Sequence, residues 1–268
     1  QGVLGLSQPS ISQQMARLET RLGYRLCSRG KGGFRLTAKG EVLLKATREL
    51  LVQIEAFRHQ ANGVAGRLLG EVRVGISEAQ DSSVTLRLAR AIERFRQRDE
   101  SVRLELVSAM PADLERQLLQ QRLDLAIGYF SGKQSAFDYM PLFEEPQRLY
   151  CASHHPFARQ SQVSLEVLRE ADQVEHPYRF METPDPLSGG RASARSEQVD
   201  GALAFILSGR HIGYLPCHFA APWVERGLLH GLDPALNFEV PFVLVRHRAQ
   251  VPSDAQQAFT DDLLAAFA

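Results

Sequence analysis

The sequence predicts an α/β protein in which a basic, mostly helical N-terminal module precedes a larger body of alternating strands and helices. Apolar residues recur at helical spacing through most of the first 70 residues, whereas short apolar runs at strand spacing alternate with helical segments beyond Gly70. Charge divides similarly, because residues 1–40 hold seven lysines and arginines and one glutamate, a net charge of +6, in a chain of net charge zero. A basic module on an acidic body is typical of a protein that binds phosphate at one end.

The first predicted helix runs from Ser7 to Leu22. Ser7 is a favourable N-cap, Pro9 suits the first turn because its missing N–H needs no partner there, and Gly23 suits the helix end. One face is apolar, with Ile11, Met15, Leu18 and Leu22. The opposite face carries small or polar groups, with Gln8, Ser12, Gln13, Ala16, Arg17 and Thr20. An amide on such a face can make two hydrogen bonds to one base edge.

A basic hairpin is predicted directly after this helix. Extended segments 24–27 and 34–36 flank the loop 28–33, which holds Arg29, Lys31 and three glycines. A helix followed by a basic hairpin is the geometry of a winged helix-turn-helix. A solvated cationic face on an ordinary helix would explain the charge alone. The groove-sized polar face, the capped helix and the hairpin together favour the DNA-binding geometry.

A long helix is predicted over residues 41–69, with Thr37 as its N-cap. Its apolar residues follow two heptad series, which are the a and d positions of a coiled coil. The series are Leu43, Leu50, Phe57 and Val64, and Thr47, Ile54, Ala61 and Leu68. A helix packed on its own domain is the alternative, but a long, narrow stripe favours pairing with a second copy. Gly70 is predicted to terminate the helix.

The body beyond residue 70 is predicted to contain a parallel sheet with right-handed crossovers, because strands and helices alternate. The first strands are 72–76, 102–107 and 123–128, separated by a helix around Leu88 and a helix that begins at Pro111. Further predicted strands are 138–143, 148–152, 178–181, 212–216 and 240–245. Further predicted helices are 165–170, 197–208, 217–226 and 252–267.

Two stretches of the N-terminal module carry a specific family resemblance. Residues 6–15 (LSQPSISQQM), with Leu18-Glu19 and Leu22-Gly23, and residues 36–41 (LTAKGE) resemble the DNA-binding domain of the LysR-type transcriptional regulators. The resemblance implies a winged helix-turn-helix and a linker helix, then a two-lobed effector domain similar to periplasmic binding proteins. The implied divisions are 1–40 for the DNA-binding domain, 41–69 for the dimerising linker helix, 70–152 with 240–268 for lobe I, and 153–239 for lobe II.

The N-terminus and the DNA contacts follow from the same resemblance. Residues 1–4 resemble the tail of a helix, so part of the native N-terminus is expected to be missing. The helix is expected to enter the major groove of double-stranded DNA with Gln8, Pro9, Ser12 and Gln13 facing bases. Phosphates are expected to meet Arg29, Lys31, Arg35 and, more weakly, Thr37, and Ser7 and Arg17 complete the predicted set. Many family members carry arginine in place of Gln13, and glutamine shifts the preference from guanine towards adenine.

An effector cleft is predicted at the carboxyl ends of the strands, where ligands bind in open α/β sheets. These ends carry Ser77, Glu78, Ser108, Tyr129 and Phe130 in lobe I, and Met181, Glu182 and Gln198 in lobe II. Taken singly, each residue is equally well explained as an ordinary loop or cap residue. The resemblance places the cleft between the lobes. Two glutamates near the cleft would repel a carboxylate, so the hypothesis is a neutral, cationic or amphipathic effector.

Other protein classes fit less well. The adjacent pairs His154-His155 and Cys217-His218 lack metal-ligand spacing, and no phosphate loop or nucleophile elbow occurs, so no enzyme, metal site or cofactor is predicted. A two-lobed solute-binding protein is the alternative. It is disfavoured because no signal peptide is visible and the N-terminal module is basic and helical. No apolar run is long enough to span a membrane.

The cysteines and the resemblance bear on location and partners. Three widely spaced cysteines favour a reducing cytoplasm over a disulfide framework, and buried, inert thiols over a redox pair of Cys151 and Cys217. The resemblance implies a homodimer formed by the linker helix and a homotetramer formed through the effector domains. It also implies RNA polymerase as a partner. The sequence itself supports only the dimer.

Overall fold

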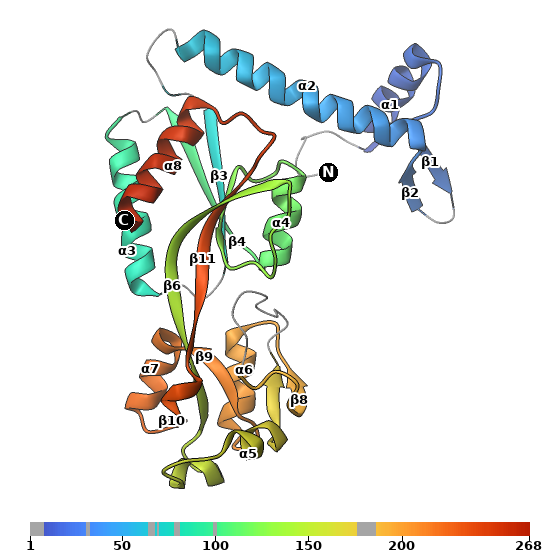
Figure 1. Ribbon diagram of the computed structural model, residues 1–268. Helices are drawn as coiled ribbons and strands as arrows, with labels where there is room; N and C mark the ends of the chain where they lie inside the picture. The colour runs from blue at the N-terminus through green and yellow to red at the C-terminus, as the bar shows by residue number, and fades with distance from the viewer. Residues whose placement is uncertain are drawn as a thin grey trace. The chain divides into compact units, whose positions relative to one another are not determined.

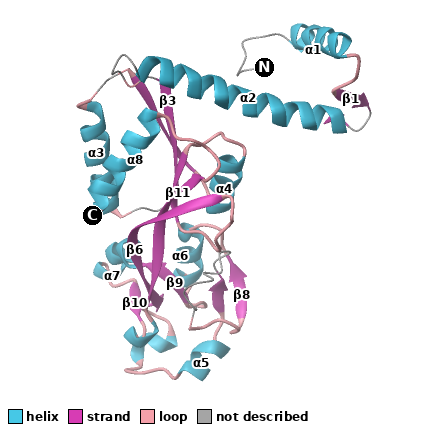
Figure 2. Cartoon of the chain, turned by 45° about the horizontal axis from the view of Figure 1, so that its top comes forward, coloured by secondary structure: helices cyan, strands magenta, loops and turns pink. Residues whose placement is uncertain are grey.

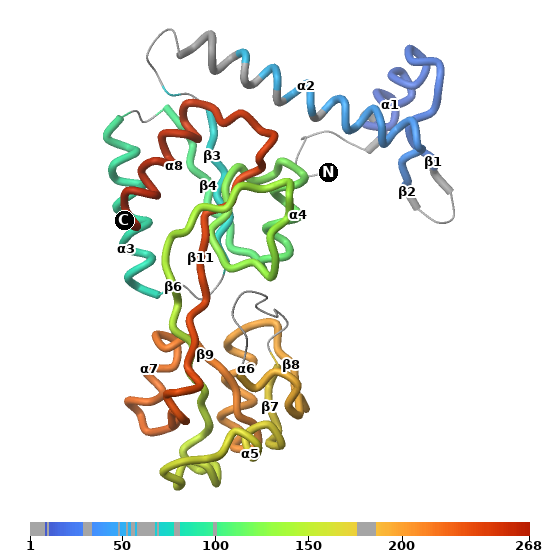
Figure 3. Tube along the Cα trace, viewed as in Figure 1, coloured from blue at the N-terminus to red at the C-terminus, as the bar shows by residue number. Residues whose placement is uncertain are grey.

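The computed structural model describes residues 8–30, 33–63, 68, 70–77, 81–98, 101–175 and 186–268. The chain divides into two units, residues 1–65 and 66–268. Figure 1 shows the elements of each unit, and Figure 3 traces the same path as a tube.

The first unit is a helix, a hairpin and a long helix. Its elements are α1 (Gln8–Leu22), β1 (Cys27–Gly30), β2 (Gly33–Leu36) and α2 (Ala38–Gly63). The two strands pair antiparallel, with Cys27 opposite Leu36. The prediction that the first strand covers residues 24–27 is wrong, because β1 begins at Cys27 and continues into the predicted loop. The Glu19 carboxylate explains this start, since Oε1 accepts hydrogen bonds from the backbone N–H groups of Leu26 (2.6 Å) and Cys27 (3.1 Å) and so holds residues 24–26 as a connection.

Leu26 and Gly40 fix the junction between the hairpin and α2. Leu26 is buried, and its carbonyl accepts the N–H of Thr37 at 2.9 Å. A Cβ added at Gly40 would collide with the Leu26 carbonyl oxygen, so only glycine allows this approach. Thr37 caps α2, since its Oγ1 accepts the N–H of Gly40 at 3.0 Å.

The second unit is built on one mixed seven-stranded sheet with the strand order β10-β6-β11-β5-β3-β4, and β9 also pairs with β6. Its strands are β3 (Gly70–Ile76), β4 (Val102–Ser108), β5 (Leu125–Gly128), β6 (Phe137–Ala152), β9 (Gly213–Pro216), β10 (Leu229–Gly231) and β11 (Phe238–His247). The predicted parallel arrangement holds for β3 with β4 and β5. The wholly parallel sheet is wrong, because β11 runs back antiparallel between β5 and β6.

Helices cover both faces of the first lobe: α3 (Ser82–Arg96) and α8 (Asp254–Phe267) on one face and α4 (Pro111–Leu119) on the other. Val72 and Val74 of β3 are fully buried in the cluster with α3 and α8. A Cβ at Gly75 would lie 2.5 Å from side-chain carbons of Leu114 and Leu123, so the opposite side of β3 meets α4 closely. The alternation of β3 thus faces two helical layers.

The strands β6 and β11 connect the two lobes, as Figures 1 and 2 show. They pair antiparallel from Phe137 opposite His247 to Gln147 opposite Phe238, with a bulge at Phe242/Val243. The prediction of two strands, 138–143 and 148–152, is wrong, because the 16 residues of β6 form one strand. Pro141 and Pro146 suggested a break, but Pro141 lies beside the bulge, where an irregular ladder tolerates proline.

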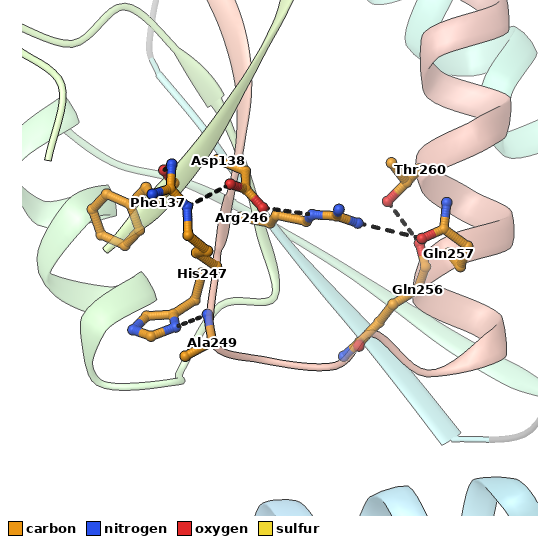
Figure 4. A network of polar contacts seen from close by, with 9 residues as sticks. Phe137, Asp138, Arg246, His247, Ala249, Gln256, Gln257 and Thr260 are labelled. Atoms are coloured by element: carbon orange, nitrogen blue, oxygen red, sulfur yellow. Dashed lines mark hydrogen bonds and ion pairs between the residues drawn. The ribbon is translucent and has the colours of Figure 1, made fainter. Parts of the chain in front are cut away.

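A polar network ties the returning β11 and α8 to the first lobe (Figure 4). Arg246 lies between Asp138 of β6, with Nε 3.6 Å from Oδ2, and Gln257 of α8, with Nη1 3.3 Å from Oε1. Arg248 Nε donates to Asp138 Oδ1 at 2.8 Å. These contacts hold the C-terminal segment in lobe I, as the resemblance implied.

The second lobe surrounds the far ends of the crossing strands. It contains η1 (Pro156–Arg159), α5 (Leu165–Glu170), β7 (Gln173–Glu175), β8 (Ala192–Arg195), α6 (Val199–Leu207), α7 (Cys217–Glu225) and η2 (Pro234–Leu236). The short strands β7, β8 and β10 were not predicted. The predicted strand 178–181 lies outside the described residues.

Candidate functional site

The outward face of α1 is polar and exposed. Gln13 and Arg17 lie one turn apart and are both exposed, as is Pro9, while Ser12 is half-buried. The apolar residues of α1 are half-buried, except that Leu18 is 42% exposed. The helix therefore presents an amide and a guanidinium side by side, a pair suited to base edges and phosphates.

The basic hairpin is fixed to α1 through Glu19. The hydrogen bonds from Leu26 and Cys27 lower the pKa of the Glu19 carboxyl. Arg35 of β2 is exposed, and the backbone of Arg29 pairs with that of Phe34 in the hairpin. Of the other predicted residues, Ser7 and Lys31 lie outside the described residues, as do the side chains of Gln8 and Arg29.

Thr37 has partners within its own unit. Its Oγ1 donates to the carbonyl of Arg25 at 2.8 Å and accepts the N–H of Gly40 at 3.0 Å. Because the hydroxyl proton is already used, the side chain is suited to joining the hairpin to α2.

A cavity of about 190 Å³ opens between the two lobes of the second unit. Its walls come from both lobes and from the crossing strands β6 and β11. The described residues that line it with polar or aromatic groups are Tyr129, Glu145, Gln147, Glu197, Gln198, Asp200, Tyr214, Phe219 and Phe242. Apolar walls with a few convergent polar groups are typical of small-molecule sites, although this cavity is smaller than the usual ~300 Å³.

Glu145 and Gln147 form the polar floor of this cavity. They are two residues apart on β6, so their side chains lie on one face of the strand. Both are buried, and Gln147 Nε2 donates to Glu145 Oε2 at 2.8 Å. Burial, with a further contribution from Asp81, raises the pKa of Glu145 to about 8. An uncompensated buried carboxyl is a frequent feature of binding sites.

The comparison with known proteins addresses both units. Residues 2–41 match the bacterial regulatory helix-turn-helix domain of the lysR family, and residues 65–268 match the LysR substrate binding domain. The chain is 31% identical over 265 residues to the HTH-type transcriptional activator BauR of Pseudomonas aeruginosa, covering 97% of this chain and 87% of BauR. The chain belongs to the LysR family of transcriptional regulators.

Solved structures of LysR regulators share the fold. The crystal structure of CbnR, a LysR family transcriptional regulator, aligns over 99% of this chain and 91% of CbnR, with a TM-score of 0.60 and 18% identity. Full-length OxyR from Pseudomonas aeruginosa aligns over 96% of this chain and 86% of its own, with a TM-score of 0.59 and 22% identity. The predicted fold class, a winged helix-turn-helix and linker helix before a two-lobed effector domain, is confirmed, and the solute-binding alternative is rejected.

The predicted effector residues of this LysR regulator separate into three groups. Tyr129 and Gln198 line the cavity. Glu78, Met181 and Glu182 lie outside the described residues. Ser77, Ser108 and Phe130 are described but are not part of the cavity lining.

The three residues away from the cavity have other surroundings. Ser77 is 1% exposed and lies against Gly128, where an added Cβ would be 3.1 Å from its Oγ. Phe130 packs edge-on to Tyr139, with ring centroids 6.2 Å apart, and Ser108 is exposed at the end of β4. Being at a strand's carboxyl end does not suffice to reach the cavity.

Sequence reasoning missed Glu145, Gln147, Glu197 and Asp200. The first two fell in the gap between two predicted strands. A glutamate and a glutamine two residues apart inside one continuous strand would have been the signal, because such side chains share a face with apolar neighbours.

A second cavity of about 440 Å³ also includes Glu145. Its charged and polar lining includes Asp81, Arg87, Glu144, Cys217 and His218. His218 Nδ1 lies 3.8 Å from Glu145 Oε1. The hinge carboxyl of this LysR regulator is therefore shared between two cavities.

The thiols and other ligand classes complete the description. Cys27, Cys151 and Cys217 are free, and burial raises the pKa of the Cys151 thiol to about 11, which favours an inert thiol. Within the described residues, no cluster of three metal-ligating side chains is present. No helix of the described part is long and apolar enough to cross a membrane.

Proposed function

We propose that this LysR regulator reads its operator with α1 and changes its hold on DNA when a small molecule fills the interlobe cavity. The observation that carries the proposal is the exposed pair of Gln13 and Arg17 on α1, in a unit that also exposes Arg35 on its hairpin. Gln13 would read a base edge while Arg17 and Arg35 bind phosphates beside the groove. Gln8, Pro9, Ser12, Arg29 and Lys31 belong to the same proposed surface.

The coupling between effector and DNA would pass through the crossing strands. Glu145, Gln147 and Phe242 line the cavity and belong to β6 and β11, the strands that connect the lobes. A ligand that contacts both lobes and these strands favours one arrangement of the lobes over another. Its differential affinity for the two arrangements sets the size of the regulatory effect.

Pairing of two copies through α2 supplies the second DNA-reading helix. Leu50, Ile54 and Phe57 occupy the heptad positions of α2 and are 58%, 43% and 70% exposed in the single chain. Such a stripe is expected to be covered by the same stripe of a second copy. We further infer a tetramer through the effector domains, contact with RNA polymerase at the promoter, and a place in the cytoplasm with the DNA.

Selection from a random pool of DNA duplexes tests the proposal. Full-length protein is expected to select a partly palindromic site, and affinity for that site should fall steeply with salt, because phosphate contacts release counterions. The selected half-sites should be spaced by about one helical turn or its multiples. Recovery of no preferred sequence contradicts the proposal that α1 reads an operator.

A further inference from the structure

The interlobe cavity has a one-sided charge. Its described lining contains three carboxyl side chains, those of Glu145, Glu197 and Asp200, and no lysine, arginine or histidine belongs to that described lining. An anionic ligand would meet repulsion from all three. A cationic ligand would meet three favourable partners.

The position of the carboxyls on α6 strengthens this argument. The N-terminus of α6 points its positive dipole end towards this region and would by itself attract an anion. Asp200 lies in the first turn of α6, and Glu197 directly precedes the N-cap residue Gln198. The protein's own carboxylates thus already balance the helix dipole, and Glu145 remains as an additional acid on the opposite strand.

Glu145 is the most constrained of the three. It is 6% exposed, whereas Glu197 and Asp200 are exposed, and Gln147 holds one of its oxygens at 2.8 Å. A buried carboxyl held in one orientation makes a strong ion pair with a cation that enters the same cavity.

The aromatic side chains suit the rest of such a ligand. Tyr129 and Phe242 meet edge to face with ring centroids 5.5 Å apart, and Tyr214 and Phe219 also line the cavity. Aromatic faces attract cations and bury the methylene groups that carry them. A volume of about 190 Å³ limits the ligand to a small metabolite.

We propose that the effector is a small molecule with a protonated amine, and that Glu145 binds this amine while the aromatic walls cover its carbon chain. This inference rests on the proposed function, in that it assumes the cavity to be the effector site. It narrows the neutral, cationic or amphipathic effector that Glu78 and Glu182 suggested to a cation or a zwitterion.

Proton exchange is expected to accompany binding. With its pKa raised to about 8, Glu145 is largely protonated in the empty cavity at neutral pH, and an ammonium group would displace the proton. The groups that face Glu145 are Gln147 on β6, His218 on α7, Asp81 at the start of α3, and Glu144, Arg87 and Cys217 in the second cavity. Amine affinity should rise with pH to a plateau above about 8, because a primary amine stays protonated up to about 10.

Calorimetry on the full chain with n-butylamine, 4-aminobutyrate, butyrate and butyramide tests the inference. Binding of either amine with proton release, and no binding of butyrate or butyramide, is the expected result. Proton release is measured by repeating the titration in buffers of different ionisation enthalpy. Binding of butyrate or butyramide alone, or failure of both amines at millimolar concentration, overturns the inference.

Two variants assign the amine contact. E145Q keeps an acceptor for Gln147 but removes the charge, and it should lower amine affinity at least tenfold and abolish proton release. E144Q removes a carboxyl on the same strand that lies outside the cavity lining, and it should leave amine affinity unchanged. Equal effects in both variants, or none in E145Q, contradict the assignment to Glu145. Should E145Q fail to fold, the pH dependence of amine binding by the native protein decides the question.

The operator selection separates this inference from the proposed function. A protein that selects a DNA site but binds only anions or neutral compounds keeps its regulatory function and loses the amine assignment. A protein that binds amines in the cavity but selects no DNA site loses the proposed operator recognition while the amine assignment stands.

Discussion

Gln147 Nε2 donates a hydrogen bond to Glu145 Oε2 at 2.8 Å, and the two side chains share one face of β6 where that strand passes between the lobes. The bond favours the ionised carboxyl, but burial dominates and raises the pKa of Glu145 to about 8. Folding therefore places a group that is normally ionised at neutral pH where its protonated form is preferred. Stability and ligand choice both depend on this conflict.

The first prediction concerns stability against pH. Because the folded-state pKa of Glu145 is raised from 4.5 to about 8, its favourable contribution is fully present below about 4.5 and is lost as pH rises towards about 8. The free energy of unfolding of the native protein, relative to that of E145Q, should fall by up to about 1.4 kcal/mol per pH unit across this window. Urea denaturation at a series of pH values measures it.

A matched control for this experiment is E93Q, which removes an exposed carboxyl on α3. Its difference from the native protein should stay nearly constant over the same pH range. A difference between the native protein and E145Q that stays flat, or that grows with pH, contradicts the description of Glu145 as a buried acid.

The cavity shows what the sequence can and cannot predict about a site. The general location was accessible, because strands of an α/β sheet end at a common edge, and Tyr129 and Gln198 do line the cavity. Glu145 was not accessible, because its role depends on β6 continuing through Pro146 and on its pairing opposite Val240 of a distant strand. Such pairing is long-range information that local periodicity does not carry.

The second prediction concerns base preference. Gln13→Ala should remove a preference, expected to be for adenine, at one position of each half-site and weaken binding to the selected operator by about 1–3 kcal/mol. Gln14 is the control, since it is also exposed but lies off the polar face of α1. Competition binding with operators altered at single positions provides the measurement. An unchanged specificity profile in Gln13→Ala would refute the assignment of α1 as the reading helix.

A third prediction separates phosphate contacts from base contacts. Arg35→Ala should weaken binding to all sequences alike and reduce the slope of log affinity against log salt by about one, because one phosphate contact is lost. Arg122→Ala removes an exposed arginine from the second unit and should leave the slope unchanged. Sequence-dependent weakening by Arg35→Ala would instead place this side chain at a base edge.

Local rules predicted most helices, and tertiary contacts decided the rest. The helix 165–170 was predicted with its observed bounds, since Ser164 caps it and Leu168 is its buried residue. The start of β1 was mispredicted, because Glu19 captures the N–H groups of Leu26 and Cys27 from a previous helix. The strands β7 and β10 were missed because three residues each are too few to show alternation.

The fourth prediction tests the junction at Leu26. Gly40→Ala places a methyl group against the Leu26 carbonyl, so the first unit should unfold and DNA binding should be lost. Gly23→Ala has open space around it and only the cost of a positive φ of 76°, so it should lose about 1–2 kcal/mol and still bind DNA. Circular dichroism and operator binding measure both. Normal DNA binding by Gly40→Ala would show that the junction can relax.

The last prediction concerns the heptad stripe of α2, where two adjacent leucines provide an internal control. Leu50 and Leu51 are almost equally exposed, at 58% and 56%, but only Leu50 falls at an a position of the predicted coiled coil. In a dimer formed by this stripe, Leu50→Asp buries two facing carboxylates and should shift the protein towards monomers, whereas Leu51→Asp places its charge in solvent and should not. Sedimentation velocity over a range of concentrations distinguishes the two. The operator site is read by two copies, so the Leu50→Asp protein should also bind half-sites with little preference for their spacing. Equal dissociation by both variants would mean that α2 pairs through a broader surface than the heptad positions, and no dissociation by either would place the dimer contact elsewhere in the chain.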